Sequence, residues 1–550
     1  MNKTKGGVTI KTINGNKYYY YQWYENGKRR SKTISEQEYY NYLNSDKTVL
    51  TNNSNVLYTG NSLKELIKRV GDYKKRYCYT NLRSFLYEPT AAKVFILYGL
   101  RRSGKTTLIY QALKGMNEDD FSKSAYILAN DKYDLGQLNT LMNNLYESGY
   151  RFVFIDEVTF IPDFIDGCQF LADIYGSLMH VVLSGTDSLG FLIASNNALY
   201  NRTITVHTTY IPFKEFSEVL GIDNVDTYIE YGGTMVKEGI DYHHNISPVF
   251  YDEESTISYI DSAIIANIQH SLNNYKDGRN YERLTSLKES GELTNVINRI
   301  IQDENHRFLV EVINRTFKSN DYGSLKELVR KNDYSPYLRT FIDTVDENKI
   351  YQLLIDALDI HNTILDIDEA TMTDLYTYLK MLDVIKEIDV LNVETGKRNK
   401  RIVFTQPGLR YSQVKSLVES MLNSDEFSTL PEDLISFLEN LTLNDVKGRI
   451  LEDIVLLETQ LIKKEETVKL KFLYGEIDMG IYKNHQIHLY EVKHSHTINE
   501  MQARHLKNEE YMKLLSSKYN KVASKNILYQ GPNTIVDGIN YLNVSDYLKE

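Results

Sequence analysis

The sequence has 550 residues, more than one hydrophobic core usually supports, so we expect about two to four domains. Hydrophobic residues make up 42% of the chain and charged residues 25%, a balance that excludes disorder on a large scale. The net charge of −11 argues against a protein that coats nucleic acid non-specifically, so any nucleic-acid contact must come from local basic patches.

The sequence gives no sign of a membrane protein or of a disulfide-rich one. No run of about 18 apolar residues is present, and the first residues lack the apolar core of a secretory signal. Cys78 and Cys168 are the only cysteines, too few for a metal cage or a disulfide framework. We therefore expect a cytoplasmic protein without membrane contact.

The first 50 residues predict a small module of strands and a short helix. Two strand-like runs flank Asn14-Gly-Asn16, a strong hairpin signal, and a second turn at Glu25-Asn-Gly27 leads into a basic run. Ser35 and Glu38 then resemble a capping box. The interleaved tyrosines and basic residues fit either a stacking platform for nucleic acid or a meander with a thin core, and we favour the meander.

The remaining chain predicts four further parts after a polar linker at residues 51–55. Strands and helices alternate over 56–240, which is typical of a parallel sheet with helices on its faces. Residues 241–345 predict a helical, lid-like region, residues 346–440 a winged-helix-like domain, and residues 441–550 a second α/β domain.

An apolar strand over residues 93–98 runs directly into a phosphate-loop motif. The loop reads Gly-Leu-Arg-Arg-Ser-Gly-Lys-Thr-Thr over residues 99–107, and a helix is expected from about Leu108. A strand before the loop and a helix after it are the context that this motif requires. The candidate nucleotide-binding residues of the loop are Gly99, Ser103, Gly104, Lys105, Thr106 and Thr107.

Each residue type in the loop has a chemical reason. Gly99 and Gly104 let the backbone turn tightly, so that its N–H groups point at phosphate near the positive end of the helix dipole. Lys105 is expected to reach the β- and γ-phosphates of ATP, and the Thr106 hydroxyl to coordinate Mg²⁺.

Two further strands complete the predicted nucleotide site. The strand at 150–155 ends in Asp156 and Glu157, which are expected to hold Mg²⁺ and to polarise the attacking water, respectively. The strand at 180–183 is followed by Ser184 and Thr186, either of which can report the γ-phosphate.

A helix followed by a hairpin gives the outline of a winged helix near residue 400. One face of the helix is apolar, with Leu375, Leu379, Leu382 and Ile385. The hairpin tip is basic and either contacts nucleic-acid phosphate or is a solvated loop. Its basic residues are Lys397, Arg398, Lys400 and Arg401.

The last part predicts a helix, three strands, a helix and a strand, with acidic residues at positions that can face one another. Glu452 lies beside the apolar face of a helix that begins near Val446, so it can face a sheet. Glu491 and Lys493 are two residues apart on a strand and project from the same face. With Asp478 on the neighbouring antiparallel strand, two carboxylates and an amine can converge, a set that suits Mg²⁺.

These motifs together resemble the AAA+-type ATPases of archaea and bacteria that carry a nuclease-like C-terminal domain. The resemblance covers roughly residues 60–550 and rests on the three nucleotide-site motifs. Additional matches are Asn201-Arg202, Pro212-Phe-Lys-Glu-Phe216 and Tyr231-Gly-Gly233.

The resemblance implies roles for three arginines. Arg202 corresponds to an arginine that acts either as a finger toward the γ-phosphate of a neighbouring subunit, which requires a homo-oligomer, or as a structural clamp. Arg101 and Arg102 are also typical of the family, and either neutralise phosphate or bind the edge of the sheet.

The C-terminal part resembles the PD-(D/E)XK nuclease fold. In this resemblance Asp478 is the metal-binding aspartate, Glu491 and Lys493 are the (D/E)XK residues, and Glu452 is the upstream helix glutamate. Gln502 corresponds to a polar residue that some relatives place near the DNA backbone. The implied metal ligands are Glu452, Asp478 and Glu491.

The sequence therefore predicts an ATPase with ATP and Mg²⁺ as cofactors and nucleic acid, preferably DNA, as partner. The leading hypothesis couples ATP to cleavage by the C-terminal domain. The alternatives are a nucleotide-dependent switch whose C-terminal domain binds a partner without cleaving it, and a protein-binding regulator.

Overall fold

The computed structural model of the chain describes most of its residues. They are residues 7–13, 16–25, 28–35, 57–71, 73–88, 92–130, 134–162, 164–187, 190–191, 202–235, 249–274, 281–318, 347–360 and 367–550. The chain divides into two compact units, one formed by Met1–Leu57 with Asp241–Ser247 and the other by Tyr58–Ile240 with Pro248–Glu550.

The first unit contains a three-stranded antiparallel sheet in the order β1-β2-β3. Its strands are β1 (Gly7–Ile13), β2 (Asn16–Glu25) and β3 (Lys28–Ile34). Both predicted hairpins are confirmed as antiparallel pairs. Residues 14–15 and 26–27 of the predicted turns, Glu38 of the predicted capping box, and the predicted linker lie outside the described residues.

A six-stranded sheet in the order β4-β6-β7-β8-β5-β9 holds the phosphate loop. Its strands are β4 (Leu57–Thr59), β5 (Val94–Tyr98), β6 (Ser124–Leu128), β7 (Phe152–Asp156), β8 (His180–Gly185) and β9 (Thr203–His207). The pairs β5–β8, β5–β9, β6–β7 and β7–β8 are parallel, as predicted.

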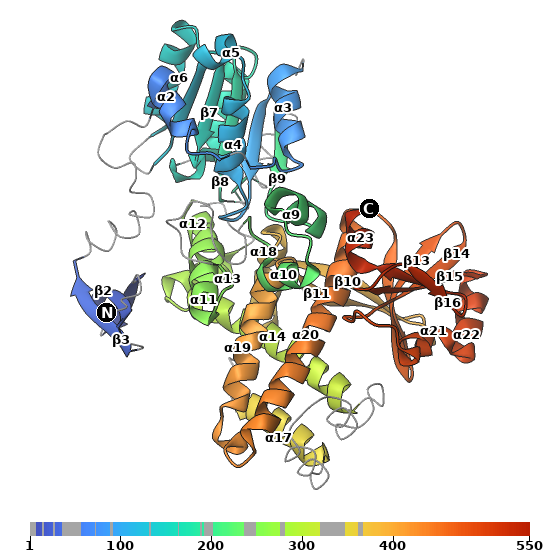
Figure 1. Cartoon of the computed structure of the whole chain (residues 1–550). Helices are drawn as coiled ribbons and strands as arrows, with labels where there is room; N and C mark the ends of the chain where they lie inside the picture. Colours follow the sequence, from blue (N-terminus) through green and yellow to red (C-terminus); the bar gives the residue numbers. More distant parts are fainter. Residues whose placement is uncertain are drawn as a thin grey trace. The chain divides into compact units, whose positions relative to one another are not determined.

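Helices flank this sheet (Figure 1), and its central strands are nearly continuous runs of buried apolar residues. Such runs are typical of parallel strands covered on both faces. The flanking helices are α2 (Gly60–Ile67), α3 (Tyr79–Tyr87), α4 (Lys105–Lys114), α5 (Glu118–Ser122), α6 (Leu135–Glu147) and α7 (Phe164–Tyr175).

The region after the sheet is helical, as predicted. It contains α9 (Phe213–Leu220), α10 (Val225–Tyr231), α11 (Glu253–Tyr259), the π-helical turn η2 (Ile260–Ile265), α12 (Ala266–Asn274), α13 (Glu282–Glu289), α14 (Leu293–Lys318), α17 (Glu347–Ile360) and α18 (Glu369–Met381). The predicted apolar face is confirmed, because Leu375, Leu379, Leu382 and Ile385 are all buried in one core. Leu100 of the phosphate loop belongs to the same core.

The predicted hairpin is present as β10 (Ile385–Asn392) and β11 (Arg398–Phe404), an antiparallel pair. It does not stand apart as the wing of a separate domain, because β10 also pairs in parallel with β12. The hairpin is thus one edge of an eight-stranded sheet in the order β11-β10-β12-β13-β14-β15-β17-β16.

The other strands of this sheet are β12 (Thr467–Phe472), β13 (Gly475–Lys483), β14 (Gln486–Val492), β15 (Val522–Tyr529), β16 (Thr534–Val536) and β17 (Ile539–Asn543). The prediction of one final strand was incomplete, since β16 and β17 form an added hairpin. Helices α21 (Arg504–Lys507), α22 (Glu509–Tyr519) and α23 (Val544–Lys549) complete the part.

Helices α19 (Pro407–Leu422) and α20 (Glu432–Leu461) lie side by side and lead from the hairpin to the rest of the sheet (Figure 1). The expected start of the last helix, near Val446, was wrong, because α20 begins at Glu432. Residues 440 and 441, where we divided the chain, therefore lie within one helix.

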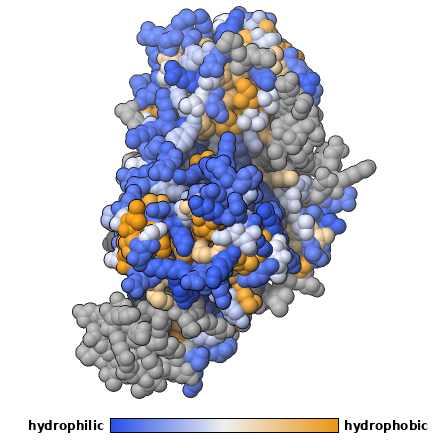
Figure 2. All heavy atoms as spheres, turned by 90° about the vertical axis from the view of Figure 1, so that its right-hand side faces the viewer, coloured by the Kyte–Doolittle hydropathy of each residue, from blue (hydrophilic) through white to orange (hydrophobic). Residues whose placement is uncertain are grey.

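Apolar residues gather in several places among hydrophilic ones on the face shown in Figure 2. In the described part of the chain, no helix combines the length and apolar character needed to cross a membrane.

Candidate functional site

The phosphate loop has the strand–loop–helix geometry that the motif predicts. It follows β5 and ends at Gly104, which precedes α4, so the helix starts at Lys105 rather than near Leu108. Gly99 and Gly104 have φ values of 147° and 86°, which favour glycine. A Cβ on Gly99 would lie 2.6 Å from the Thr208 hydroxyl, so the loop leaves no room for a side chain there.

Lys105 lies inside this loop and is 6% exposed. Its ammonium donates to the carbonyl oxygens of Gly99 and Leu100 at 2.8 and 2.9 Å. Burial lowers the pKa of Lys105 to about 8, against the opposing effect of Glu157 and Asp156. An anionic partner such as phosphate would therefore stabilise the charged form of Lys105.

Asp156 connects the predicted Mg²⁺ ligands at the end of β7. Thr106 Oγ1 donates to Asp156 Oδ2 at 2.8 Å, and Ser184 donates to Asp156 Oδ1. Tyr126, which the sequence did not single out, also donates to Asp156 Oδ2 at 2.8 Å. A buried carboxylate beside a threonine hydroxyl is a set of hard oxygen donors, so these residues fit Mg²⁺.

Glu157 follows Asp156 with φ of 56°, a left-handed conformation uncommon for glutamate. Such strain occurs at functional sites when the surrounding structure fixes it, and here it sets the direction of the residue directly after the metal-binding carboxylate. Of the two sensor candidates, Ser184 contacts Asp156, whereas Thr186 is half-buried.

The other predicted loop residues differ in their surroundings. The Ser103 hydroxyl is buried and donates to Leu100 O at 2.9 Å, and Thr107 is half-buried on α4. Arg101 is exposed, whereas Arg102 has φ of 66° and accepts a hydrogen bond from Met235 N at 3.0 Å.

Arg202 does not lie at this nucleotide site. It precedes β9, whose Thr203 pairs with Val94 at the start of β5, whereas the phosphate loop follows the end of β5. Five strand residues separate the two ends, roughly 16 Å. Arg202 Nε contacts Asp173 Oδ1 at 2.6 Å, a contact that fits the clamp role.

Arg76, absent from our predictions, donates hydrogen bonds that hold the phosphate loop. It is buried and donates to Ser103 O at 2.6 Å and to Thr208 O at 2.7 Å. Its ion pair with Glu215, at 2.8 Å, gives a structural role to the Pro-Phe-Lys-Glu-Phe match. No local sequence signal reveals this pair, because its members are 139 residues apart.

Helix α12 covers the segment that follows the sensor strand. Asn267 donates to the Thr186 carbonyl, and Asp187 accepts from Ser271 Oγ at 2.5 Å and lies 3.2 Å from His270 Nδ1. The helical region therefore contacts the segment directly after β8, at the same end of the sheet as the nucleotide-site residues.

A second group of charged residues lies in the C-terminal sheet. Lys493 Nζ lies 2.6 Å from Glu491 Oε2 and 3.5 Å from Asp478 Oδ2, so the convergence expected from strand alternation is present. Asp478 and Glu491 are each 1% exposed. Burial, partly offset by Lys493, raises the pKa of Glu491 well above its usual value, and Asp478 raises it further.

Glu452 and Glu476 extend this acidic cluster. Ligand atoms of Glu452, Glu476 and Asp478 lie within 4.8 Å of one another, a grouping able to hold a metal ion. The sequence analysis missed Glu476, although its two-residue spacing from Asp478 on β13 places both on one face. The nearby cations Arg315, Arg449 and Lys469 hold the pKa of Glu452 well below its usual value, against the effect of burial.

Two features of these residues favour the binding of a divalent cation, and one feature opposes it. Carboxylates suit hard cations, and Asp478 Oδ1 and Glu491 Oε1 are buried without a hydrogen-bond partner among the described residues. Against this, four carboxylates already face four cations. The carboxylates belong to Glu452, Glu476, Asp478 and Glu491, and the cations to Arg315, Arg449, Lys469 and Lys493.

Gln502 lies at the start of the helical segment Glu500–Ala503, where its side chain takes part in the cap. Its side chain donates to Thr497 O at 3.0 Å and accepts from Asn499 N at 3.1 Å, which forms a helix cap. The pKa of His505, three residues later, is affected by charged residues of the cluster. Burial and then Arg504 and Lys493 lower its pKa to about 4, so it is neutral at pH 7.

The basic hairpin tip is largely paired with acidic residues. Arg401 contacts Asp453 at 2.8 Å and is 16% exposed, which leaves it unsuited to a nucleic-acid contact. Arg398 and Lys400 lie 3.9 and 3.4 Å from Asp389. Lys397 is exposed.

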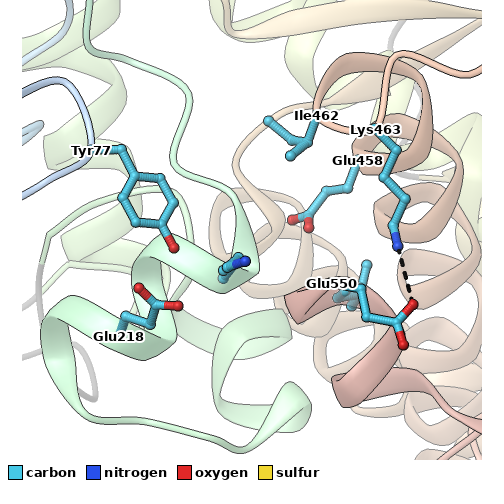
Figure 3. A pocket seen from close by; sticks show the side chains of 8 residues that line it. Tyr77, Glu218, Glu458, Ile462, Lys463 and Glu550 are labelled. Atoms are coloured by element: carbon cyan, nitrogen blue, oxygen red, sulfur yellow. Dashed lines mark ion pairs between the residues drawn. The ribbon is translucent and has the colours of Figure 1, made fainter. Parts of the chain in front are cut away.

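A cavity of about 440 Å³ lies between α9 and the ends of α20 and α23 (Figure 3). It is lined by Tyr77, Lys214, Glu218, Glu458, Ile462, Lys463, Leu548 and Glu550. None of these residues belongs to the phosphate loop or to the acidic cluster, so the cavity is not either candidate site.

Comparison with known families identifies the nucleotide-binding part. Residues 91–217 match the family model of an AAA domain. The match contains the phosphate loop, Asp156 and Glu157, so this part is an AAA-type ATPase domain, which implies ATP binding and hydrolysis. No curated protein matches the chain.

Among solved structures, the Walker-type ATPase of Pyrococcus abyssi is 13% identical, with 62% of this chain and 95% of that chain covered and a TM-score of 0.29. The Aeropyrum pernix Orc1 protein in complex with DNA is 11% identical, covers 69% of this chain and 100% of its own, and has a TM-score of 0.24. The chain spans only 31% of Saccharomyces cerevisiae Hsp104 from its casein complex, with 29% of this chain covered, 11% identity and a TM-score of 0.23. The ATPase assignment therefore comes from the family match.

Proposed function

We propose that the chain couples ATP hydrolysis in its AAA-type domain to Mg²⁺-dependent cleavage of nucleic acid, preferably DNA, in its C-terminal part. The observation that carries the proposal is the convergence of Asp478, Glu491 and Lys493 from paired strands in a chain that also has an AAA-type domain. The division of the preceding chain into residues 1–50, 56–240 and 241–345 and a cytoplasmic location belong to the same proposal.

In the ATPase part, each residue has a task that follows from its position. Lys105 and the N–H groups around Gly99 and Gly104 hold phosphate, while Thr106 and Asp156 would hold Mg²⁺, which neutralises phosphate charge when bound. Glu157 polarises the water that attacks the terminal phosphate. Ser184 would sense the phosphate, a role that its hydrogen bond to Asp156 supports.

In the C-terminal part, Glu452, Asp478 and Glu491 would hold a divalent cation, which activates water and stabilises charge on a phosphodiester when bound. Glu476 lies close enough to Glu452 and Asp478 to share such an ion with them. Lys493 keeps a raised pKa because of Glu491 and Asp478, so it remains charged where negative charge develops.

The second candidate is a nucleotide-dependent switch that binds a partner without cleaving it. The balance of carboxylates against Arg315, Arg449 and Lys469 favours it, because a neutral cluster has less need of a metal ion.

Cleavage assays distinguish the two functions. The parent protein and Asp478→Asn are incubated with Mg²⁺ or Mn²⁺, with and without ATP, and with linear, circular and single-stranded DNA and RNA. We expect cleavage by the parent, loss of at least about 100-fold in Asp478→Asn, and unchanged ATP hydrolysis in both. If the parent cleaves none of these substrates, the switch function takes the place of the nuclease.

A further inference from the structure

Arg315 belongs to α14, outside the C-terminal sheet, yet its side chain enters the acidic cluster. Its guanidinium lies 2.5 Å from Glu452 Oε1, 3.6 Å from Glu476 Oε1 and 3.9 Å from Asp478 Oδ1. These are the three carboxylates that lie close enough together to share one metal ion. A single guanidinium from the helical region therefore contacts every member of the candidate metal group.

The same end of α14 is held on α20 by polar contacts. Thr316 Oγ1 donates to Asp445 Oδ2 at 2.6 Å, and Glu311, one turn before Arg315, lies 3.3 Å from Arg449 Nη2. Glu311 and Arg315 are thus four residues apart on one helix face and both engage the cluster or its cations. Val312 and Ile313, between these residues, are buried, so apolar packing also holds this end of α14, and the exchangeable contacts are those of the polar side chains.

Lys469 contacts the same three carboxylates but differs from Arg315 in its freedom. It lies on β12, inside the sheet, and its side chain is 2% exposed. The Arg315 side chain is 29% exposed and comes from a separate element. Arg315 is therefore the cation that can leave without disruption of the sheet.

Helix α14 also reaches the apolar core that contains Leu100 of the phosphate loop. Ile297, Ile300 and Ile301, near its start, lie in the same apolar core as Leu100 of that loop. One helix of 26 residues thus has one end in this core and the other at the acidic cluster. This placement gives the nucleotide site a physical route to Arg315.

We propose that Arg315 is an intramolecular counter-ion that closes the C-terminal acidic site, and that a divalent cation binds there only after the Arg315 side chain has moved away from the carboxylates. The two cations exclude each other because they need the same carboxylates and repel one another at such short separations. The inference rests on the proposed function, since it assigns metal binding to this cluster. It adds that the helical region decides when the site is loaded.

The test is Mn²⁺ binding to the full-length protein without nucleotide, measured from the free Mn²⁺ signal in electron paramagnetic resonance. Arg315→Gln removes the charge and is expected to bind Mn²⁺ at least about tenfold more tightly than the parent. Arg315→Lys keeps the charge and is expected to stay within about threefold. Arg307→Gln is the matched control, because Arg307 lies on the same helix, is 67% exposed and contacts Glu304 instead, at 3.6 Å.

A double variant locates the gained site. Asp478→Asn in the Arg315→Gln background is expected to abolish the added Mn²⁺ binding, while circular dichroism shows that every variant is folded. Unchanged or weaker Mn²⁺ binding in Arg315→Gln overturns the inference, and so does a gain that survives Asp478→Asn.

The inference and the proposed function can fail separately. If the parent cleaves nucleic acid but Arg315→Gln binds Mn²⁺ no more tightly, the counter-ion role is wrong and the nuclease remains. If Arg315→Gln gains the Mn²⁺ site but neither protein cleaves, the counter-ion role holds and the cleavage proposal is wrong.

Discussion

The pKa values of two lysines are shifted in opposite directions because their partners differ. Lys105 donates to backbone carbonyls, and burial lowers its pKa to about 8 despite two carboxylates nearby. Lys493 is half-buried, and direct contacts with Glu491 and Asp478 raise its pKa against the effect of burial. Lys105 therefore suits a site that binds an anion, whereas the charge of Lys493 is already compensated by Glu491 and Asp478.

Lys105→Ala and Glu157→Gln separate ATP binding from ATP hydrolysis. Lys105→Ala removes a charge from the phosphate loop and is expected to weaken ATP binding by about 100-fold or more. Glu157→Gln keeps the shape but loses the basic oxygen, so ATP binds while turnover falls by about 100-fold. Fluorescent-nucleotide titration and phosphate release measure the two effects, and equal turnover in Glu157→Gln and the parent would remove Glu157 from catalysis.

Glu458 predicts a pH dependence of stability. Burial raises its pKa from 4.5 to about 8, against hydrogen bonds from Phe213 N and Tyr228. Its contribution to the free energy of unfolding is therefore fully present below pH 4.5 and is lost as the pH rises through about 8.

The matching variant is Glu458→Gln, which keeps the hydrogen-bond acceptor but does not titrate. Between pH 6 and pH 9 the parent is expected to lose more thermal stability than the variant, by about 3 °C or more in Tm. Thermal unfolding followed by circular dichroism at both pH values checks this, and parallel Tm changes in the two proteins would contradict it.

Among the elements, the turn after α10 shows how close backbone packing joins distant parts. Gly408 N donates to Gly232 O at 3.0 Å, and Gln406 Nε2 donates to Gly233 O at 2.9 Å. A Cβ on Gly233 would lie 2.5 Å from Gln406 Cβ and 2.6 Å from Gln406 Cα. The Tyr-Gly-Gly match noted in the sequence therefore has a packing reason.

Gly233→Ala is expected to destabilise the protein by about 2–4 kcal/mol, because both a left-handed φ of 105° and a backbone clash oppose the added methyl group. Gly291→Ala is the matched control, since Gly291 has φ of 81° but open space around its Cβ, and should cost only about 1 kcal/mol. Urea unfolding measures both. Equal losses in the two variants would show that φ alone matters.

At the scale of the whole second unit, one short segment connects the two candidate sites. His494 Nε2 lies 2.5 Å from Asp226 Oδ1, and Lys447 Nζ lies 2.5 Å from Glu230 Oε1. The same segment ends at Met235, whose N–H donates to Arg102 O in the phosphate loop. Residues 226–235 therefore contact the phosphate loop at one end and the residue after Lys493 at the other.

Arg202 bears on assembly, because a finger role requires a neighbouring subunit. Its ion pair with Asp173 in the same chain and its place at the far edge of the sheet favour a clamp. Arg202→Ala is therefore expected to keep its turnover within about twofold and to lose less than about 1 kcal/mol of stability, since both partners are partly exposed. Phosphate release per subunit over a range of protein concentrations is the measurement, and turnover that rises with concentration and collapses in Arg202→Ala would establish the finger role instead.

The sequence alone determined the features whose chemistry is contiguous or periodic. The phosphate loop needs its glycines, lysine and threonine in one run, and strand alternation by itself brought Glu491 and Lys493 to one face toward Asp478. The same alternation could have revealed Glu476. Tertiary structure decided the contacts between residues far apart in the chain, such as Arg76 with Glu215 and Arg315 with Glu452.

These contacts leave no local pattern because a charged residue on a helix looks the same whether water or a distant carboxylate neutralises it. Only folding determines which buried carboxylates receive which cations. The joining of the β10–β11 hairpin to the C-terminal sheet has the same cause, since the hydrogen bonds between β10 and β12 come from backbone groups, which every sequence carries.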